Sequence, residues 1–133
     1  MSRRRLIVAT VVLLPAAGVA AHHSIAGVYD RNSPVTLRGN VSEFRLVNPH
    51  AFMTMHAEGD GPADFWKLEL DNRSELADIG ITPLTFMPGD RIVATGSRAR
   101  DGSRGIYALR IDRPIDGFWY EQVGSSPRVG RTR

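Results

Sequence analysis

Two neighbouring histidines near the amino terminus are the residues of this sequence best suited to chemistry. His22 and His23 follow Ala20-Ala21, small residues at which a signal peptidase can cut. Cleavage after Ala20 would make His23 the third residue, and its imidazole, the free amine and two backbone amides would form the square-planar nitrogen site that copper(II) favours. Cleavage after Ala21 would instead pair the amine of His22 with its own ring nitrogen. The alternative interpretation is a solvated tail that binds nothing.

A third histidine, His50, follows Asn48-Pro49 at a break between two predicted strands. Loop positions on a rigid scaffold often carry binding residues, so His50 is a candidate to complete the terminal chelate. The predicted metal ligands are therefore His22, His23 and His50, and the predicted metal is copper. As a lone histidine, His50 would be a surface or core-edge residue with ordinary hydrogen bonds. His56 ranks below it, since strand alternation makes that side chain solvated or half-buried.

The remaining sulfur and carboxylate groups favour structural roles. Met53 and Met55 are expected to fill the core rather than to bind copper(I). Acidic residues stand two apart in or beside strands and so share a face; a pair could serve as general acid and base, but a solvated face is the favoured interpretation. These pairs are Glu58 with Asp60 and Glu69 with Asp71. The sequence has no nucleophile elbow, phosphate loop, metalloprotease helix or dinucleotide fingerprint, and we expect no enzymatic activity.

The first 21 residues have the three zones of a secretory signal peptide. A positive stretch, Arg3-Arg4-Arg5, precedes an apolar run over residues 6–14 and a small-residue segment over residues 15–21. The apolar run is too short for a comfortable bilayer span. We expect residues 1–21 to be removed, no stable membrane span to remain, and the mature protein to lie in the periplasm or to be secreted. The sequence contains no cysteine, so this domain must be held by its core without disulfides.

The charge of the chain does not indicate a nucleic-acid partner. The formal net charge is +3, but three arginines lie in the predicted signal peptide and every acidic residue lies after it. The mature chain is therefore close to neutral, whereas a phosphate-binding domain concentrates lysine and arginine on one face. We expect no nucleic-acid binding.

Hydrophobic alternation and turn residues predict a mainly β domain over residues 22–124. The expected fold is a small five-stranded barrel of OB type with one short helix between its third and fourth strands; an open β-sandwich fragment is the alternative. The expected strands cover residues 35–47, 51–58, 64–71, 91–99 and 106–111, and the expected helix covers residues 72–80. Phe118-Trp119-Tyr120 is expected to cap the open end of the barrel, or to form a partly exposed partner surface. Residues 125–133 are expected to be a disordered tail.

The motifs of the chain, taken in order, resemble those of a family of small exported bacterial proteins of unknown function. The resemblance rests on Ala21-His22-His23-Ser24 with Tyr29-Asp30, residues 34–39, Asn48-Pro49-His50, Pro88-Gly89-Asp90 and residues 96–102. It implies an exported, mainly β domain. The joint occurrence of the His-His pair and the Asn-Pro-His turn favours a shared site at His22, His23 and His50. The chain departs from the pattern at Ala51, where an aromatic residue often follows, and in its aromatic and arginine-rich C-terminus.

Together these features predict an exported periplasmic binding protein that holds a transition metal, copper, through His22, His23 and His50. The alternative is an OB-like interaction module that binds a peptide, a glycan or a partner protein without metal. Because the terminal chelate depends on where the signal peptide is cut, the mature N-terminal residue bears directly on the choice between them.

Overall fold

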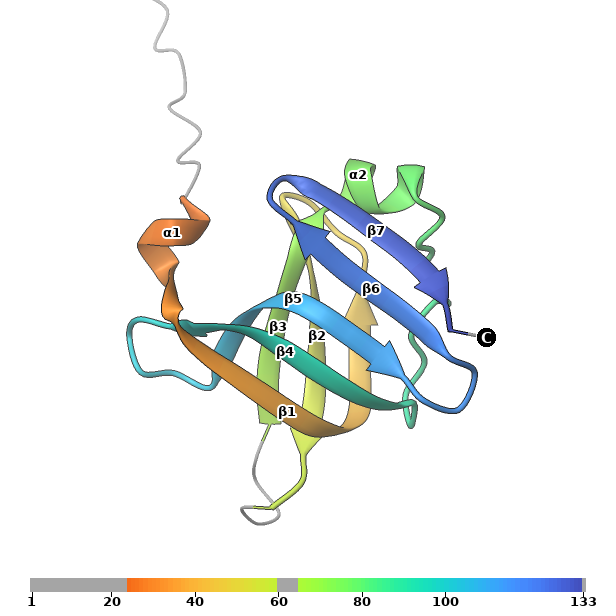
Figure 1. Ribbon diagram of the computed structural model, residues 1–133, viewed down its shortest axis with the longest axis horizontal. Helices are drawn as coiled ribbons and strands as arrows, with labels where there is room; N and C mark the ends of the chain where they lie inside the picture. Colours follow the sequence, from red (N-terminus) through yellow and green to blue (C-terminus); the bar gives the residue numbers. More distant parts are fainter. Residues whose placement is uncertain (1–23, 60–64, 133) are drawn as a thin grey trace, which may run out of the picture.

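The computed structural model describes residues 24–59 and 65–132, which form a mainly β domain, as predicted (Figure 1). Its elements are α1 (Ile25–Val28), β1 (Tyr29–Arg45), β2 (His50–Ala57), β3 (Phe65–Asn72), α2 (Arg73–Asp78), β4 (Arg91–Ala99), β5 (Gly105–Arg113), β6 (Phe118–Val123) and β7 (Ser126–Arg131). The predicted signal peptide, His22 and His23 lie outside the described residues. Within the described ranges, no helix is both long and apolar enough to cross a bilayer.

The strands form one sheet in the order β3-β2-β1-β4-β5-β6-β7. A parallel pairing of β3 with β5 joins two distant strands of this order, so the pairings of the first five strands close into a ring. The helix expected between the third and fourth strands is present as α2. The predicted five-stranded barrel is nevertheless wrong in its strand count, because β6 and β7 extend the sheet beyond β5 to seven strands.

β1 ties the sheet together and is longer than its hydrophobic pattern suggests. It begins at Tyr29 rather than at residue 35, because its polar first residues pair with the end of β4. The first part of β1 pairs with β4 and the last part with β2, and the two registers meet around Gly39. A Cβ at Gly39 would collide with the carbonyl oxygen of His56. Glycine therefore permits the close backbone approach at the point where β1 changes partner.

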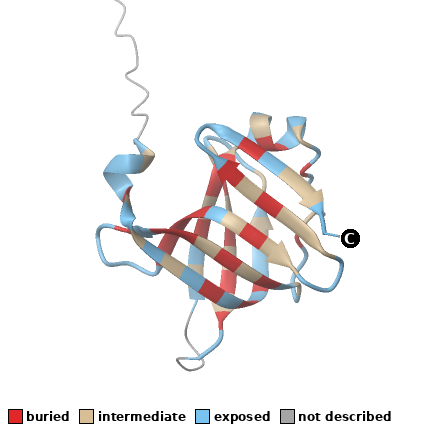
Figure 2. Ribbon diagram, in the orientation of Figure 1, coloured by how far each residue is buried: buried red, intermediate tan, exposed pale blue. Residues whose placement is uncertain are grey.

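The alternation of β2 defines the inner face of the sheet. Every second side chain of β2 is buried and the intervening ones are half-buried, and Figure 2 shows similar banding along neighbouring strands. Met53 and Met55 are fully buried, which confirms their expected role in the core. A side chain of this size contributes about 1.5–3 kcal/mol when it is taken from water into the core. His56 is half-buried, and its ring meets Phe65 edge-on at 5.4 Å between centroids.

The C-terminal segment corrects the prediction of a disordered tail. The aromatic segment Phe118-Trp119-Tyr120 begins β6, and Tyr120 is fully buried in the core. Most of the expected disordered tail forms β7, which pairs with β6 along its whole length. The composition of Ser126–Arg131 is poor in apolar residues, so its order comes from backbone pairing and from side-chain contacts such as Arg128 with Glu121 at 2.9 Å.

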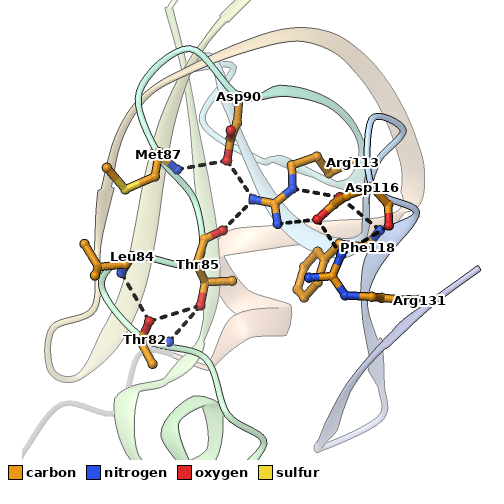
Figure 3. A network of polar contacts seen from close by, with 9 residues as sticks. All are labelled: Thr82, Leu84, Thr85, Met87, Asp90, Arg113, Asp116, Phe118 and Arg131. Carbon is orange, nitrogen blue, oxygen red and sulfur yellow. Dashed lines mark hydrogen bonds and ion pairs between the residues drawn. The ribbon is translucent and has the colours of Figure 1, made fainter.

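An arginine-centred network fixes the long connection between α2 and β4 (Figure 3). The Arg113 guanidinium donates to the carbonyl oxygen of Thr85 at 2.6 Å and to Asp90 at 2.7 Å. It also donates two hydrogen bonds to Asp116, which in turn accepts from Arg131 of β7 at 2.5 Å. The guanidinium of Arg113, followed by that of Arg131, holds the pKa of the Asp116 carboxyl below its ordinary range. One half-buried arginine thus joins a loop, a turn and the last strand.

Candidate functional site

The most distinctive polar arrangement in the described residues is a chain of three side chains, Tyr29–Glu69–His50. The Tyr29 hydroxyl donates to one oxygen of Glu69 at 2.6 Å, and the other oxygen lies 2.5 Å from Nδ1 of His50. A carboxylate only accepts hydrogen bonds, so Nδ1 carries the proton and donates. Burial and the Glu69 hydrogen bond raise the pKa of the Tyr29 phenol, which keeps that group a donor.

Three separate elements bring these side chains together. His50 is the first residue of β2 and lies opposite Asn72, while Glu69 lies opposite Phe52. Glu69 alternates with the core residues Leu68 and Leu70, so its side chain leaves the sheet on the opposite face. Tyr29 reaches that face from the start of β1. The site therefore depends on the β2–β3 register and on the early start of β1.

His50 borders a shallow, open hollow of about 270 Å³. The other residues that line the hollow are Val47, Asn48, Pro49, Phe52, Lys67 and Glu69. The Asn48–Pro49 peptide bond is cis, and the Lys67 ammonium lies 4.7 Å from the centre of the Phe52 ring. The side chain of His50 remains 29% exposed, so a ligand can reach its ring from this side.

This arrangement prepares one ring nitrogen of His50 for binding. With Nδ1–H engaged by Glu69, the neutral imidazole has its lone pair on Nε2, and no hydrogen bond to Nε2 is found among the described residues. A carboxylate behind an imidazole fixes its tautomer and orientation and makes the second nitrogen a better base or metal ligand. Across residues 24–59 and 65–132, no three His, Cys, Asp or Glu side chains are grouped so that they could hold a metal alone. A metal at His50 would need further ligands from elsewhere.

A second polar chain lies two residues along β3, at Asp71. The Tyr120 hydroxyl donates to Oε1 of Gln122 at 2.6 Å, and Nε2 of Gln122 donates to Asp71 at 2.7 Å. The other Asp71 oxygen accepts from the backbone N–H of Asn72 at 2.7 Å. The pKa of the Glu75 carboxyl is raised, first because it shares a hydrogen bond with Asp71. The two chains thus place two hydrogen-bonded carboxylates, Glu69 and Asp71, on one face of β3.

The structure describes only some of the predicted site residues. His50 lies in a prepared position, whereas His22 and His23 fall outside the described residues, so the shared site stays a prediction. His56, ranked lower, lies at the far end of β2 against Phe65. The expectation of a solvated face for Glu69 and Asp71 is wrong, because Glu69 is only 23% exposed and Asp71 is buried.

The missed residues had one usable signal in the sequence. Glu69 and Asp71 alternate with the apolar residues Leu68 and Leu70, and their spacing places them on one face. Their partners Tyr29 and Gln122 are distant along the chain, at 40 and 51 residues. Strand alternation gives the face of a carboxylate, but not the side chain that meets it there.

Comparison with known proteins gives one family match, to a family of unknown function. A protein-family model described as a family of unknown function, DUF6152, matches residues 10–107. No curated protein and no solved structure gives a significant match to the chain. The match includes His22, His23 and His50 and ends within β5, so β6 and β7 lie beyond the matched segment.

Proposed function

The chain belongs to the DUF6152 family, whose function is unknown, and we propose that it is an exported binding protein that holds a transition metal, copper, at a site containing His50. His22 and His23, with the amine that signal-peptide cleavage would free, supply the remaining nitrogen ligands. The observation that carries this proposal is the hydrogen-bonded chain Tyr29–Glu69–His50.

The support from His50 lies in how its ring is held. Metal-binding imidazoles commonly donate their second N–H to a carboxylate, which is itself held by a further hydrogen bond. Glu69 and Tyr29 have these two positions behind His50, at 2.5 and 2.6 Å. The ring also remains partly open to the hollow beside β2.

The short distance along the chain supports a shared site. Tyr29, which contacts Glu69, is separated from Ser24 only by α1, a helix of four residues and so about 6 Å long. His23 immediately precedes Ser24 in the sequence. The covalent path from His23 to Tyr29 is therefore short, and Tyr29 contacts the carboxylate that holds His50.

The donor set favours copper among the divalent metals. The ligands proposed are imidazole, amine and amide nitrogens, and the chain offers no thiolate. For nitrogen sites copper(II) binds most tightly in the first-row series, and it accepts a square-planar arrangement. Once exported and cleaved, the proposed protein would bind copper outside the cytoplasm.

A copper titration distinguishes this proposal from the alternative. The alternative is an OB-like interaction module that binds a peptide, a glycan or a partner protein without metal. Processed protein, with its mature amino terminus verified by intact mass, is titrated with copper(II) at neutral pH. We expect stoichiometric binding with a nitrogen-rich spectroscopic signature. Affinity should fall as the pH drops through the ordinary histidine range, because imidazole must be neutral to bind a metal. Absence of stoichiometric binding would leave the interaction module.

Variants separate a shared site from a terminal chelate alone. His50→Ala should weaken copper binding, and Glu69→Gln should weaken it about 10–100-fold by loosening the ring. His56→Ala is the matched control and should leave affinity unchanged, since His56 lies at the other end of the same strand. If His50→Ala had no effect while acetylation of the amino terminus abolished binding, His50 would not be a ligand.

A further inference from the structure

A groove that is lined in part by Tyr29, and not by His50, is not explained by metal binding. It consists of two adjoining hollows of about 220 and 210 Å³ that share Ile25, Arg31, Tyr107, Gln122 and Gly124. The first hollow also reaches Tyr29 and Leu109, and the second reaches Asp71 and Glu75. We call this feature the Tyr107 groove. Its size is at the small end of ligand pockets, which span roughly 300–1,000 Å³.

Tyr107 is the first indication that the groove receives a ligand. Its side chain is only 8% exposed and its ring packs on that of Tyr29 at 5.9 Å. Two other buried tyrosines have hydroxyl partners, Tyr29 with Glu69 and Tyr120 with Gln122. The Tyr107 hydroxyl has no hydrogen bond to any residue that the structure describes. Buried hydroxyls are normally satisfied, so this donor lacks an acceptor that a ligand would provide.

Charged side chains lie close to Tyr107 in the second hollow. Burial raises the pKa of the Tyr107 phenol, and the carboxylates of Asp71, Glu69 and Glu75 raise it further, while Arg31 lowers it. Asp71, Glu75 and Arg31 all line the second hollow with Tyr107. Tyr107 therefore shares the groove with charged groups, and its hydroxyl remains protonated as a donor.

The charged groups of the groove are of both signs. Asp71 and Glu75 line the second hollow together, and the nearby Asp71 raises the pKa of the Glu75 carboxyl. An ammonium group placed beside the two carboxylates would make favourable charge contacts with both. Arg31 and the Tyr107 hydroxyl are donors that suit a carboxylate. Ile25 and Leu109 add apolar surface next to both.

We propose that the Tyr107 groove binds a small zwitterion, a free α-amino acid with an aliphatic side chain. Its ammonium group contacts Asp71 and Glu75, and its carboxylate accepts from Tyr107 and Arg31. Its side chain lies against Ile25 and Leu109. The proposal goes beyond copper binding, since none of these contacts involves His50.

Binding of L-leucine to the metal-free protein tests this inference. The processed protein is kept in EDTA, because amino acids chelate copper, and titration is followed by nuclear magnetic resonance and calorimetry. Leucine amide lacks the carboxylate and 4-methylpentanoate lacks the ammonium group. We expect leucine to shift resonances of groove residues and both analogues to bind at least tenfold more weakly, the loss of one charge-assisted contact.

Variants identify the groove as the site. Tyr107→Phe and Glu75→Gln should each weaken leucine binding about tenfold, and Arg31→Gln likewise. Arg38→Gln, an exposed arginine on the same strand, is the matched control for Arg31 and should leave affinity unchanged. His50→Ala should also bind leucine normally, which separates this inference from the copper proposal.

Three outcomes would overturn the proposal. No saturable leucine binding by folded protein would reject a zwitterion site. Equal affinity for leucine and leucine amide would replace the free amino acid by the amino terminus of a peptide. Normal binding by a folded Tyr107→Phe variant would place the ligand elsewhere.

Discussion

At the residue scale, three buried tyrosines show how the same side chain can serve different purposes. Tyr29 supports Glu69 and through it His50, whereas Tyr120 supports Gln122 and through it Asp71. Tyr107 supports no described side chain through its hydroxyl. A hydrogen bond between buried groups contributes only modestly to stability, but breaking one leaves its partner unsatisfied. The three hydroxyl groups should therefore respond differently to removal.

The first prediction compares two of these tyrosines by chemical unfolding. Tyr120→Phe should lower the free energy of unfolding by about 1–2 kcal/mol, because it leaves the Gln122 oxygen buried without its donor. Tyr107→Phe removes a hydroxyl that lacks a described partner and should leave stability unchanged or slightly higher. A loss in Tyr107→Phe as large as that in Tyr120→Phe would show that the Tyr107 hydroxyl is already satisfied within the protein.

At the element scale, the C-terminal hairpin of β6 and β7 is part of the folded unit. β6 contributes Tyr120 to the core and Gln122 to the polar chain at Asp71. β7 contributes Arg131, which meets the Arg113–Asp116 pair at the turn before β6 (Figure 3). The connection from α2 to β4 joins the same pair through Asp90 and Thr85. Arg113 and Asp116 together thus link the connection from α2 to β4 with the last strand.

The second prediction concerns the pH dependence of this link. The folded pKa of Asp116 is lowered, so its contribution to stability is full above the ordinary aspartate pKa and is lost as the pH falls through the folded value. Asp116→Asn should therefore lower the melting temperature at neutral pH, and its difference from the unmodified protein should shrink in acid. Asp78→Asn, on the exposed side of α2, is the control and should show neither effect. A difference that stayed constant with pH would contradict an ionic role for Asp116.

At the scale of the whole molecule, the polar sites gather where the start of the chain meets the sheet. α1 brings Ile25 to the Tyr107 groove, and Tyr29 lies between this groove and Glu69. The proposed copper ligands and the proposed amino-acid groove therefore flank one stretch of chain. The copper proposal assumes a chain whose amino terminus has been processed.

The third prediction tests that assumption directly. Protein purified from the periplasm of an expressing bacterium should have an intact mass that corresponds to a start at Ala21 or His22, since the preceding residues have the zones of a signal peptide. A variant with the three arginines at positions 3–5 changed to glutamate is the control and should remain unprocessed. Recovery of periplasmic protein that retains Met1, or that begins after Ser24, would remove the basis for a terminal chelate.

The sequence alone determined the class of fold and most element positions. Alternation predicted β2, β3, β4 and β5 to within a few residues. Membership of a family of unknown function, which the motifs indicated, is also confirmed. These features depend on local patterns, because the alternation of apolar and polar residues along a short segment already indicates which face of a strand is buried.

Only the tertiary structure decided what the polar residues do. Residues 126–131 have the composition of a tail, yet they form β7 because β6 offers a complete partner edge. Glu69 and Asp71 were assigned to a solvated face, yet they are held by Tyr29, His50 and Gln122. The physical reason is the same in both cases: a backbone edge or a carboxylate can be satisfied by any donor, and only the closure of the sheet selects which distant residue provides it.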